Sequence, residues 1–593
     1  MAYSIFQPDC TCCHRCRVEC PVQAIHFKND KYWIDPETCV DCGHCVTVCH
    51  NGCISAPGGN PPKAAPHEKI LLDCDIVVIG AGAAGTAAAA RAAASGRNVI
   101  VLEKNHEIGG SAWYAHMYRT HYSRWHQEAG VPDTREKTLR DFERKTGGRV
   151  DMELVRNILN ANVDMNNWLI DEYDLGKDYT FTMKGPFGRP GFASTYLNPI
   201  NTRRIDTSIG PAGNGWYFCT KFRSIAEENG ARFLFSTPAK HLLLDESGAV
   251  CGVLAEDDGG EYEIRCRAVV VAAGAMSRNP EWVNKMQPGF YDPDGTTRVH
   301  VFTCATCTGD GLTMCDEIGA DIDFEHKRVA MFGPARHPYP CVTLNITRGG
   351  GPSVMFNAEG APLEFAMSMS ERSFLADQPG RYCWSILDDD HCAAAIARSY
   401  GGEKDVVGID LEASYDRWRE FIADEEAAGS IVIGNTLEEL GEKLGFPDPA
   451  AFAQSAYEQS TKPMSFGPPP GGDDAGPGGE GPGAGPGDEE EGGMFGDMPP
   501  MPAPTPLQKA PFYAFKQKMY HENAIGGMKI DAHTRVLKHA QPIPGLYACG
   551  DNCSGIMLSG NIGVQYIEGV ISALTFGFNS GYLAGTEAAA YTA

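Results

Sequence analysis

Two sets of cysteines near the start of the chain have the residue type and spacing of metal ligands. Each set has the spacing C-x2-C-x2-C-x3-C, and the two are Cys10, Cys13, Cys16 and Cys20, then Cys39, Cys42, Cys45 and Cys49. The opening "MAYSIFQPDC" has neither the basic region nor the apolar core of a secretory signal, so we expect a cytoplasmic protein. In that reducing compartment, clustered thiols bind metal more often than they form disulfides.

Residues 1–58 resemble the eight-iron bacterial ferredoxins, which share this spacing and the proline after the fourth cysteine, here Pro21. In that family the fourth thiolate of each set binds the cluster held by the other set. The resemblance therefore implies two [4Fe–4S] clusters, one bound by Cys10, Cys13, Cys16 and Cys49, the other by Cys39, Cys42, Cys45 and Cys20. Zinc is the alternative, because CxxC pairs also bind it, but eight cysteines in this register favour iron–sulfur.

The repeat continues past the predicted ligands. "CPVQAI" aligns with "CHNGCI", which places Cys53 where the first repeat has Ala24, so we expect Cys53 to be a packing residue. Cys12 is out of register in the same way. Between the two sets, "AIHF" and "YWID" predict a short β-hairpin.

A dinucleotide-binding turn follows the Pro- and Gly-rich stretch "APGGNPPKAAPHEK". An apolar strand over 75–79 leads into Gly80, Gly82 and Gly85, an alanine-rich helix follows, and a second strand ends at Glu103. Glycines let the backbone approach a pyrophosphate at the helix N-terminus, and an acid at this distance binds ribose hydroxyls. In this full setting of strand, helix, strand and acid, the GxGxxG motif is a strong signal.

Three further features favour FAD over NAD. A second glycine pair, Gly109 and Gly110, comes just after the acid, and "RAVVVAAGAMS" predicts a buried strand ending near Gly274. Near the C-terminus, "IPGLYACGDNCSG" places Gly550 and Asp551 after another strand. The sequence contains no second strand–GxGxxG–helix unit, so we expect electrons to reach the flavin through the clusters.

Residues 75–593, apart from one insertion, resemble the flavoprotein family of fumarate reductase and succinate dehydrogenase. The resemblance implies an α/β FAD-binding domain (Rossmann-like, of the glutathione reductase type) with an inserted α+β cap domain, behind a small α+β ferredoxin-like domain. It also implies an FAD site formed by Gly80, Gly82, Ala83, Ala84, Gly85, Glu103, Lys104, Gly109, Gly110, Ser111, Ala239, Ala273, Gly274, Gly550, Asp551, Gly560, Asn561 and Ile562.

The same resemblance suggests residues for the substrate. Family members move hydride between the flavin and one carbon of a double bond, while a side chain transfers a proton at the neighbouring carbon. Arg372 is the nearest match to the family's proton-donating arginine and His521 to a substrate-binding histidine, each displaced by two positions. Tyr520 is a third candidate, with Tyr513 as a weaker one, because the related ketosteroid dehydrogenases use tyrosines near the flavin.

Each of these substrate-site residues has an alternative interpretation. Arg372 would also suit a surface ion pair with a neighbouring glutamate, and His521 and Tyr520 would suit packing positions. Cys304 and Cys307, a CxxC pair, are predicted to be buried free thiols, although thiols beside a flavin can be redox-active. Met557 replaces an arginine that holds a carboxylate in the family, which favours a less charged substrate than fumarate.

Composition limits the domain plan and the partners. The 593 residues predict several domains, and the net charge of −26 argues against nucleic acid and anionic membranes as partners. The apolar run after residue 75 is broken by glycines and Arg91, so no membrane span is expected. We predict a ferredoxin domain (1–58), a linker (59–74), an FAD-binding domain made of two segments (75–290 and 507–593) and, between these, a cap (291–425), a helical segment (426–465) and a disordered Pro/Gly/acidic insert (466–506).

The predicted function is reduction of an activated C=C bond, of the enone or enoate type, with electrons passing from the clusters to FAD and then to a small-molecule substrate. A protein that donates or accepts electrons is the expected partner. The route of electrons through iron–sulfur clusters suits an anaerobic metabolism. One alternative is a dehydrogenase of a saturated ketone or steroid-like substrate that exports electrons through the ferredoxin domain. The other is an electron-transfer subunit without catalysis.

Overall fold

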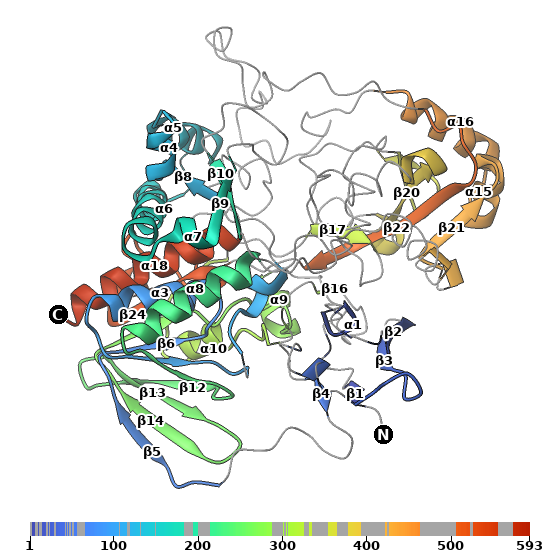
Figure 1. Cartoon of the computed structure of the whole chain (residues 1–593). Coiled ribbons are helices and arrows are strands. Elements are labelled where there is room, and N and C mark those ends of the chain that lie inside the picture. Colours follow the sequence, from blue (N-terminus) through green and yellow to red (C-terminus); the bar gives the residue numbers. More distant parts are fainter. Residues whose placement is uncertain are drawn as a thin grey trace.

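The computed structural model describes parts of residues 3–55 and most of residues 66–182, 194–199, 214–286, 300–324, 331–334, 354–363, 378–392, 422–462, 506–521, 526–554 and 573–593. Within these ranges no helix is long and apolar enough to cross a membrane. The predicted disordered insert at 466–506 lies outside the described residues, except for Pro506. Figure 1 shows how the described elements are arranged.

The N-terminal module is a group of short elements around a small core. The predicted hairpin is confirmed, because β2 (Ile25–Lys28) pairs antiparallel with β3 (Lys31–Ile34). A second antiparallel pair joins β1 (Ser4–Ile5) to β4 (Ile54–Ser55), and α1 (Arg15–Val18) follows the first cysteines. The fully buried Tyr32 lies in the core of this module with Ala24 and the described cysteines of both sets.

A six-stranded sheet forms the centre of the main domain. Its order is β11 (Arg232–Leu234), β7 (Val99–Leu102), β6 (Ile76–Ile79), β15 (Ala268–Val271), β24 (Gln541–Ala548) and β23 (Arg535–Lys538). All neighbours pair in parallel except β23 and β24. Strands β6, β7 and β15 are buried at every position, as expected for parallel strands that are covered on both faces.

Alternate residues of β6 enter two different cores. Ile76 and Val78 pack with the helices α3 (Ala83–Ala94), α8 (Asn214–Glu228) and α18 (Ala573–Tyr591). Val77 and Ile79 pack on the opposite face, in a core that includes Val253. This alternation is the period of two that a strand imposes on its side chains. The predicted strand–turn–helix–strand unit is therefore present, and its strands end within one residue of the predicted bounds.

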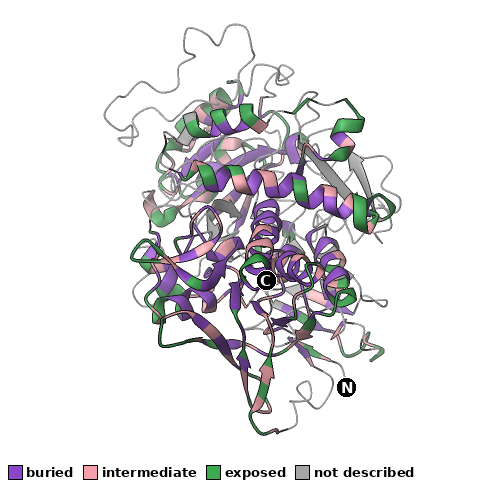
Figure 2. Cartoon of the chain, turned by 90° about the vertical axis from the view of Figure 1, so that its left-hand side faces the viewer, coloured by how far each residue is buried: buried purple, intermediate pink, exposed green. Residues whose placement is uncertain are grey.

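Small residues allow α3 and α18 to pack closely. A Cβ atom on Gly581 would lie 2.1 Å from the Ala84 carbonyl oxygen, and one on Gly585 would lie 2.4 Å from that of Ala88. Figure 2 shows the C-terminal helix largely buried, and Phe578 on it contacts Phe218 and Phe222 of α8. Helix α6 (Met152–Tyr173) also packs against α18.

A four-stranded sheet of β12 (Ala239–Leu244), β13 (Val250–Glu256), β14 (Glu261–Arg265) and β5 (Ile70–Asp73) covers the other face. The prediction of a linker over 59–74 was therefore wrong at its C-terminal end. Residues 70–73 pair in parallel with β14, and Lys69 forms an ion pair with Glu263 on that strand. The pairing joins segments nearly 200 residues apart in sequence, so no local pattern could predict it.

A seven-stranded sheet is built around β22 (Phe512–His521), and we call the unit around it the cap because most of its strands lie in the segment 291–425 predicted as the cap. The other strands are β16 (His300–Val301), β17 (Met331–Pro334), β18 (Met355–Asn357), β19 (Pro362–Leu363), β20 (Tyr382–Asp388) and β21 (Ile431–Gly434). Two predictions were wrong here. Residues 512–521 belong to this sheet and not to the FAD domain, and β21 interrupts the segment 426–465, which was expected to be helical.

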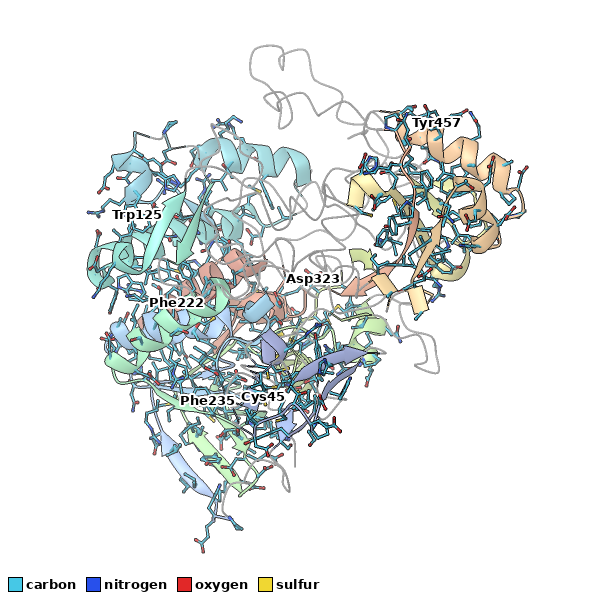
Figure 3. The ribbon with its side chains drawn as sticks, turned by 45° about the vertical axis from the view of Figure 1, so that its right-hand side comes forward. Cys45, Trp125, Phe222, Phe235, Asp323 and Tyr457 are labelled. Carbon is cyan, nitrogen blue, oxygen red and sulfur yellow. The ribbon has the colours of Figure 1, made fainter. Side chains whose placement is uncertain are left out.

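Helices α15 (Leu437–Leu444) and α16 (Pro449–Ser460) follow β21 and form the helical part of the segment 426–465. Thr436 and Asp448 cap their N-termini through side-chain oxygens, and Gly445 ends α15 in the left-handed conformation. Figure 3 shows Tyr457 of α16 at the far end of the cap, whereas Asp323 lies between the cap and the central sheet.

Further elements complete the described part of the chain. They are η2 (Gly110–Tyr114), β8 (Arg119–His121), α4 (Arg124–Glu128), α5 (Arg135–Thr146), α7 (Leu175–Asp178), β9 (Tyr179–Thr182), β10 (Ser194–Pro199), α9 (Pro280–Met286), α10 (Asp310–Glu317), η4 (Pro379–Arg381) and η5 (Gly550–Asn552). Strands β8, β10 and β9 form a three-stranded antiparallel sheet in that order.

Candidate functional site: a dinucleotide cradle and a cysteine module

The turn between β6 and α3 has the close backbone approach that its glycines predict. Gly80 has a φ of +101°, and a Cβ atom there would lie 2.4 Å from the Ala272 carbonyl oxygen. A Cβ on Gly85 would lie 1.8 Å from the Gly80 carbonyl oxygen, so only glycine fits. The first turn of α3, with Ala83 and Ala84, presents backbone N–H groups to this edge of the sheet, where anions are favoured.

Glu103 lies directly after β7 and is 6% exposed. Its Oε2 accepts a hydrogen bond of 2.7 Å from the Ala81 N–H, and its Oε1 accepts one of 2.8 Å from the Asn105 N–H. Burial raises the pKa of the Glu103 carboxyl, although the two backbone N–H groups oppose the shift. The carboxylate is thus fixed beside the glycine turn, as the ribose-binding role requires.

The second glycine pair, Gly109 and Gly110, lies against the glycine turn that follows β6. Gly109 and Gly82 form a parallel β-bridge, and the Gly109 N–H donates to the Ala81 carbonyl oxygen over 2.9 Å. Gly109 and Gly110 both have positive φ angles, +113° and +48°, which favour glycine. Ser111 follows in η2. Residues 27 positions apart therefore form one continuous backbone edge.

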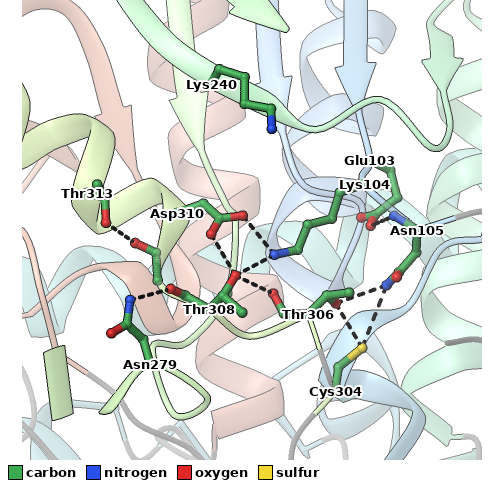
Figure 4. Close-up of polar contacts among 12 residues, drawn as sticks. Glu103, Lys104, Asn105, Lys240, Asn279, Cys304, Thr306, Thr308, Asp310 and Thr313 are labelled. Carbon is green, nitrogen blue, oxygen red and sulfur yellow. Dashed lines mark hydrogen bonds and ion pairs between the residues drawn. The ribbon is translucent and has the colours of Figure 1, made fainter. Parts of the chain in front are cut away.

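A polar network joins this edge to α10, as Figure 4 shows. Lys104 Nζ donates to Thr308 Oγ1 and to Asp310 Oδ2, both over 2.7 Å. Asn105 Nδ2 donates to Thr306 Oγ1 over 3.1 Å and contacts Cys304 Sγ at 3.6 Å. Of these residues only Lys104 was predicted for the site. The run "TGDG", which begins at Thr308, is the sequence feature that could have pointed to Thr308 and Asp310.

The ends of β15 and β24 bring together the remaining described residues of the predicted FAD site. These parallel strands are neighbours, so Ala273–Gly274 and Gly550–Asp551 follow them at the same edge of the sheet. Asn552 Nδ2 donates to the Gly274 carbonyl oxygen over 2.6 Å, and the Gly550 N–H donates to Ser580 Oγ over 2.9 Å. A Cβ on Gly550 would lie 2.9 Å from Ala84 Cβ, which links this turn to α3.

Two groups of predicted FAD contacts remain. Ala239 opens β12 two residues after Thr237, whose N–H donates to the Glu103 carbonyl oxygen over 2.9 Å. Gly560, Asn561 and Ile562 lie outside the described residues, as does Met557. We call the edge formed by the turns after β6, β7, β15 and β24 the dinucleotide cradle. Its described residues fit FAD, because glycines at three points leave room for the dinucleotide and a buried carboxylate lies at one end.

The N-terminal cysteines gather in one partly buried cluster. Cys16, Cys45 and Cys49 are buried, and Cys10, Cys20 and Cys39 pack against them. Cys13 and Cys42 lie outside the described residues. Among the residues that are described, no group of three or more Cys, His, Asp or Glu side chains could hold a metal ion.

The cysteines of the two sets nevertheless meet. Cys49 Sγ lies 3.4 Å from Cys53 Sγ, and the Cys10 side chain is a second hydrogen-bonding partner of Cys53. Cys10 and Cys49, from different sets, therefore both contact one thiol, which agrees with the crossed ligand assignment. Because the four thiolates of a cubane bind four different irons, they do not converge on a point as the ligands of a single ion do. The donor set fits iron–sulfur chemistry, and the clusters remain a prediction.

The predicted substrate residues are only partly described. Arg372 lies outside the described residues. Tyr520 and His521 end β22, where their backbones are in register with His300 and Val301 of β16. Tyr513 lies near the opposite end of β22, and its Oη lies 3.4 Å from Asp389 Oδ1.

The length of β22 separates the two tyrosines. A rise of about 3.3 Å per residue places Tyr513 and Tyr520 about 23 Å apart, so one flavin ring cannot contact both. The structure favours a packing role for Tyr513, which is buried.

The predicted burial of the CxxC pair is confirmed, because Cys304 and Cys307 are both buried and neither forms a disulfide. Cys549 and Cys553, after β24, are buried as well. Cys307 Sγ lies 3.2 Å from Ser111 Oγ, beside the predicted FAD contacts. Burial, assisted by Cys304, raises the pKa of the Cys307 thiol to about 11, so it is protonated at neutral pH.

Comparisons with known proteins agree with this geometry. The family model described as FAD binding domain matches residues 75–561, which is more than half of the chain. Urocanate reductase of Eggerthella lenta is 25% identical, with 89% of this chain and 77% of that protein aligned. Fumarate reductase (cytochrome) of Shewanella frigidimarina is 24% identical over 89% of this chain and 78% of its own length.

A third relative is named as a dehydrogenase rather than as a reductase. The 4-oxocyclohex-2-ene-1-carboxylate 5-dehydrogenase of Sinomonas cyclohexanicum is 25% identical over 87% of this chain and 94% of its own length. Among solved structures, the open conformation of a flavocytochrome c3 fumarate reductase has a TM-score of 0.57 at 21% identity, covering 88% of this chain and 79% of that one. That structure shares the FAD-binding fold of this chain. This protein belongs to the FAD binding domain family and is an FAD-dependent oxidoreductase.

Proposed function

We propose that this protein reduces an activated C=C bond of an enone- or enoate-type substrate with electrons that pass from two [4Fe–4S] clusters to FAD. The meeting of Cys10 and Cys49 at Cys53 carries the proposal, because it supports a crossed, two-cluster ligand set in the same chain as the dinucleotide cradle. The sequence contains no second dinucleotide-binding unit for a nicotinamide donor.

The residues of the cradle hold and orient the flavin. FAD, when bound, supplies hydride transfer to carbon. Glu103 fixes the adenosine end through its buried carboxylate, and the N-terminus of α3 favours the pyrophosphate. Lys104 is held by Thr308 and Asp310, and this contact ties the loop that follows β7 to α10.

The part of the site that binds the substrate needs a proton donor beside the reacting carbon. We propose Arg372, His521 and Tyr520 for proton transfer and substrate binding. Arg372 and His521 each lie two positions from a functional residue of the family, and the related ketosteroid dehydrogenases use tyrosines near the flavin. β22 brings Tyr520 and His521 to the end of the cap sheet where β16 pairs. Met557 in place of an arginine supports a substrate with fewer carboxylates than fumarate. The names of the relatives, which include reductases of urocanate and fumarate, support C=C reduction.

A single-turnover experiment tests the electron path. The full chain is purified anaerobically, reduced with dithionite, freed of excess reductant and mixed with 2-cyclohexenone, cinnamate, urocanate or 4-androstene-3,17-dione. A reduced flavin stores two electrons and each cluster stores one, so we expect about two molecules of product per enzyme. The product is counted by chromatography.

The Cys13→Ala/Cys42→Ala variant provides the control. It lacks one ligand of each proposed cluster, so we expect it to retain FAD and to yield about one product per enzyme. Equal yields from the two proteins, with iron and FAD present in the parent, would refute transfer from the clusters. No product from any substrate in either protein would refute the proposed C=C reduction.

A second candidate is oxidation of a saturated ketone with export of electrons through the ferredoxin module, and the relative named as a dehydrogenase supports that direction of reaction. The order of the reduction potentials distinguishes the two directions. A flavin potential well above those of the clusters favours reduction of the substrate, and the reverse order favours dehydrogenation.

A further inference from the structure

The two halves of the cysteine module differ at one equivalent position. Ala24 and Cys53 each lie four residues after the last cysteine of their set, Cys20 and Cys49, and both are buried. The Ala24 N–H donates to Cys20 Sγ over 3.3 Å. At the equivalent position after the second set, the Cys53 thiol, rather than a methyl group, lies beside Cys49.

The thiol of Cys53 contacts two proposed ligands of the same cluster. Its Sγ is 3.4 Å from Cys49 Sγ, and Cys10 is its other hydrogen-bonding partner. Both are proposed ligands of the first cluster, together with Cys13 and Cys16. Among the proposed ligands of the second cluster, Cys20 Sγ accepts from the Ala24 N–H and Cys39 Sγ lies 3.6 Å from Asp41 Oδ1.

A hydrogen-bond donor at a ligand sulfur changes the energy of a cluster. Reduction adds negative charge that is shared between the irons and the thiolates, so a donor stabilises the reduced form more than the oxidised form. Hydrogen bonds to the sulfurs are among the factors that set cluster potentials.

We propose that Cys53 is not a ligand but a hydrogen-bond donor that raises the reduction potential of the cluster bound by Cys10, Cys13, Cys16 and Cys49 above that of its partner. This inference rests on the proposed function, because it requires both clusters. The methyl side chain of Ala24 gives the second cluster no thiol donor at the equivalent position. The near-symmetric module thereby acquires two unequal sites, and the cluster beside Cys53 is the first to be reduced.

The internal repeat supplies matched variants. Redox titration of the full chain, followed by EPR, gives the potential of each cluster. In Cys53→Ala we expect one potential to become more negative while the other does not shift. In Ala24→Cys we expect the other potential to rise. Cys53→Ser retains a donor, so its potential should lie closer to the parent value than that of Cys53→Ala.

The Cys13→Ala background assigns the effect to a cluster. With the first cluster removed, the remaining potential should not respond to Cys53→Ala. Unchanged potentials in Cys53→Ala, in a protein with about eight irons, would overturn the inference and leave the proposed function intact. Loss of a cluster in Cys53→Ala, or a Cys49–Cys53 disulfide found by mass spectrometry in the parent, would also overturn it. Absence of iron from the parent would overturn the proposed function itself.

Discussion

At the scale of single residues, Glu103 shows how a sequence signal becomes a binding group. Its position after β7 was predicted from the spacing to the glycine turn. The structure adds that both carboxylate oxygens accept backbone N–H groups, from Ala81 and Asn105. These two bonds fix the carboxylate before any ligand binds, and backbone partners of this kind cannot be predicted from side-chain types.

We expect Glu103→Gln to weaken FAD binding by roughly 10- to 100-fold, which corresponds to about 1.5–3 kcal/mol for a hydrogen bond to a charged group. The amide removes the charge and places an N–H2 donor against a backbone N–H. Fluorescence titration of the apoprotein with FAD measures the change. Glu246→Gln, at an exposed turn, is the control. Equal FAD affinity in Glu103→Gln would show that the carboxylate does not bind the cofactor.

Asp388 is the corresponding anchor in the cap. Its Oδ2 accepts from the backbone N–H groups of Gln508 and Lys509, and its Oδ1 accepts from His391. These bonds join the end of β20 to the residues that lead into β22. Although burial opposes the shift, the hydrogen bonds hold the pKa of the Asp388 carboxyl well below its usual range.

The lowered pKa gives a prediction for stability. A carboxyl with a depressed folded-state pKa stabilises the fold above its unfolded pKa of about 3.9, and that contribution is lost as the pH falls below it. We expect Asp388→Asn to cost about 2 kcal/mol or more at pH 7. The difference from the parent should shrink below about pH 4 in denaturant unfolding. A difference that does not change with pH would contradict the role of the charge. Asp258→Asn, at an exposed turn, is the control.

At the scale of elements, local patterns predicted those segments whose partners are close in sequence. The unit of β6, α3 and β7 and the hairpin of β2 and β3 were predicted because alternation, glycines and turn residues lie within a short window. Strands β5 and β22 were misplaced because each pairs with strands far away in sequence. The aromatic residues of 512–521 favour a strand, but they do not identify the sheet to which that strand belongs.

The contact of α3 with α18 makes a prediction at this scale. We expect Gly581→Ala to destabilise the FAD domain by about 1–3 kcal/mol and to lower its FAD content, because the added methyl group would overlap the Ala84 carbonyl group. Thermal unfolding and flavin absorbance measure both effects. Gly176→Ala is the matched control in a helix, since its Cβ would lie 3.5 Å from Trp125, an ordinary contact. Wild-type stability of Gly581→Ala would contradict the close packing.

At the scale of the whole molecule, one chain contains both a dinucleotide cradle and a cysteine module. The placement of the described cradle residues at one edge of the sheet could be predicted, because they follow strand ends that meet there in a parallel sheet. The substrate end could not, because Arg372 and His521 are displaced from the family spacing and depend on how the cap lies over the flavin. The proposed ligand pairs of the module rest on the resemblance to bacterial ferredoxins, and the contacts of Cys53 support them.

Electron transfer between the two modules is tested most directly by freeze-quench EPR of the fully reduced, anaerobic chain mixed with one equivalent of a substrate that it reduces. The account predicts that the signals of the reduced clusters decline within the first turnover, while one product forms and the flavin is re-reduced. Formation of that product with oxidised flavin and with both cluster signals intact would contradict the account.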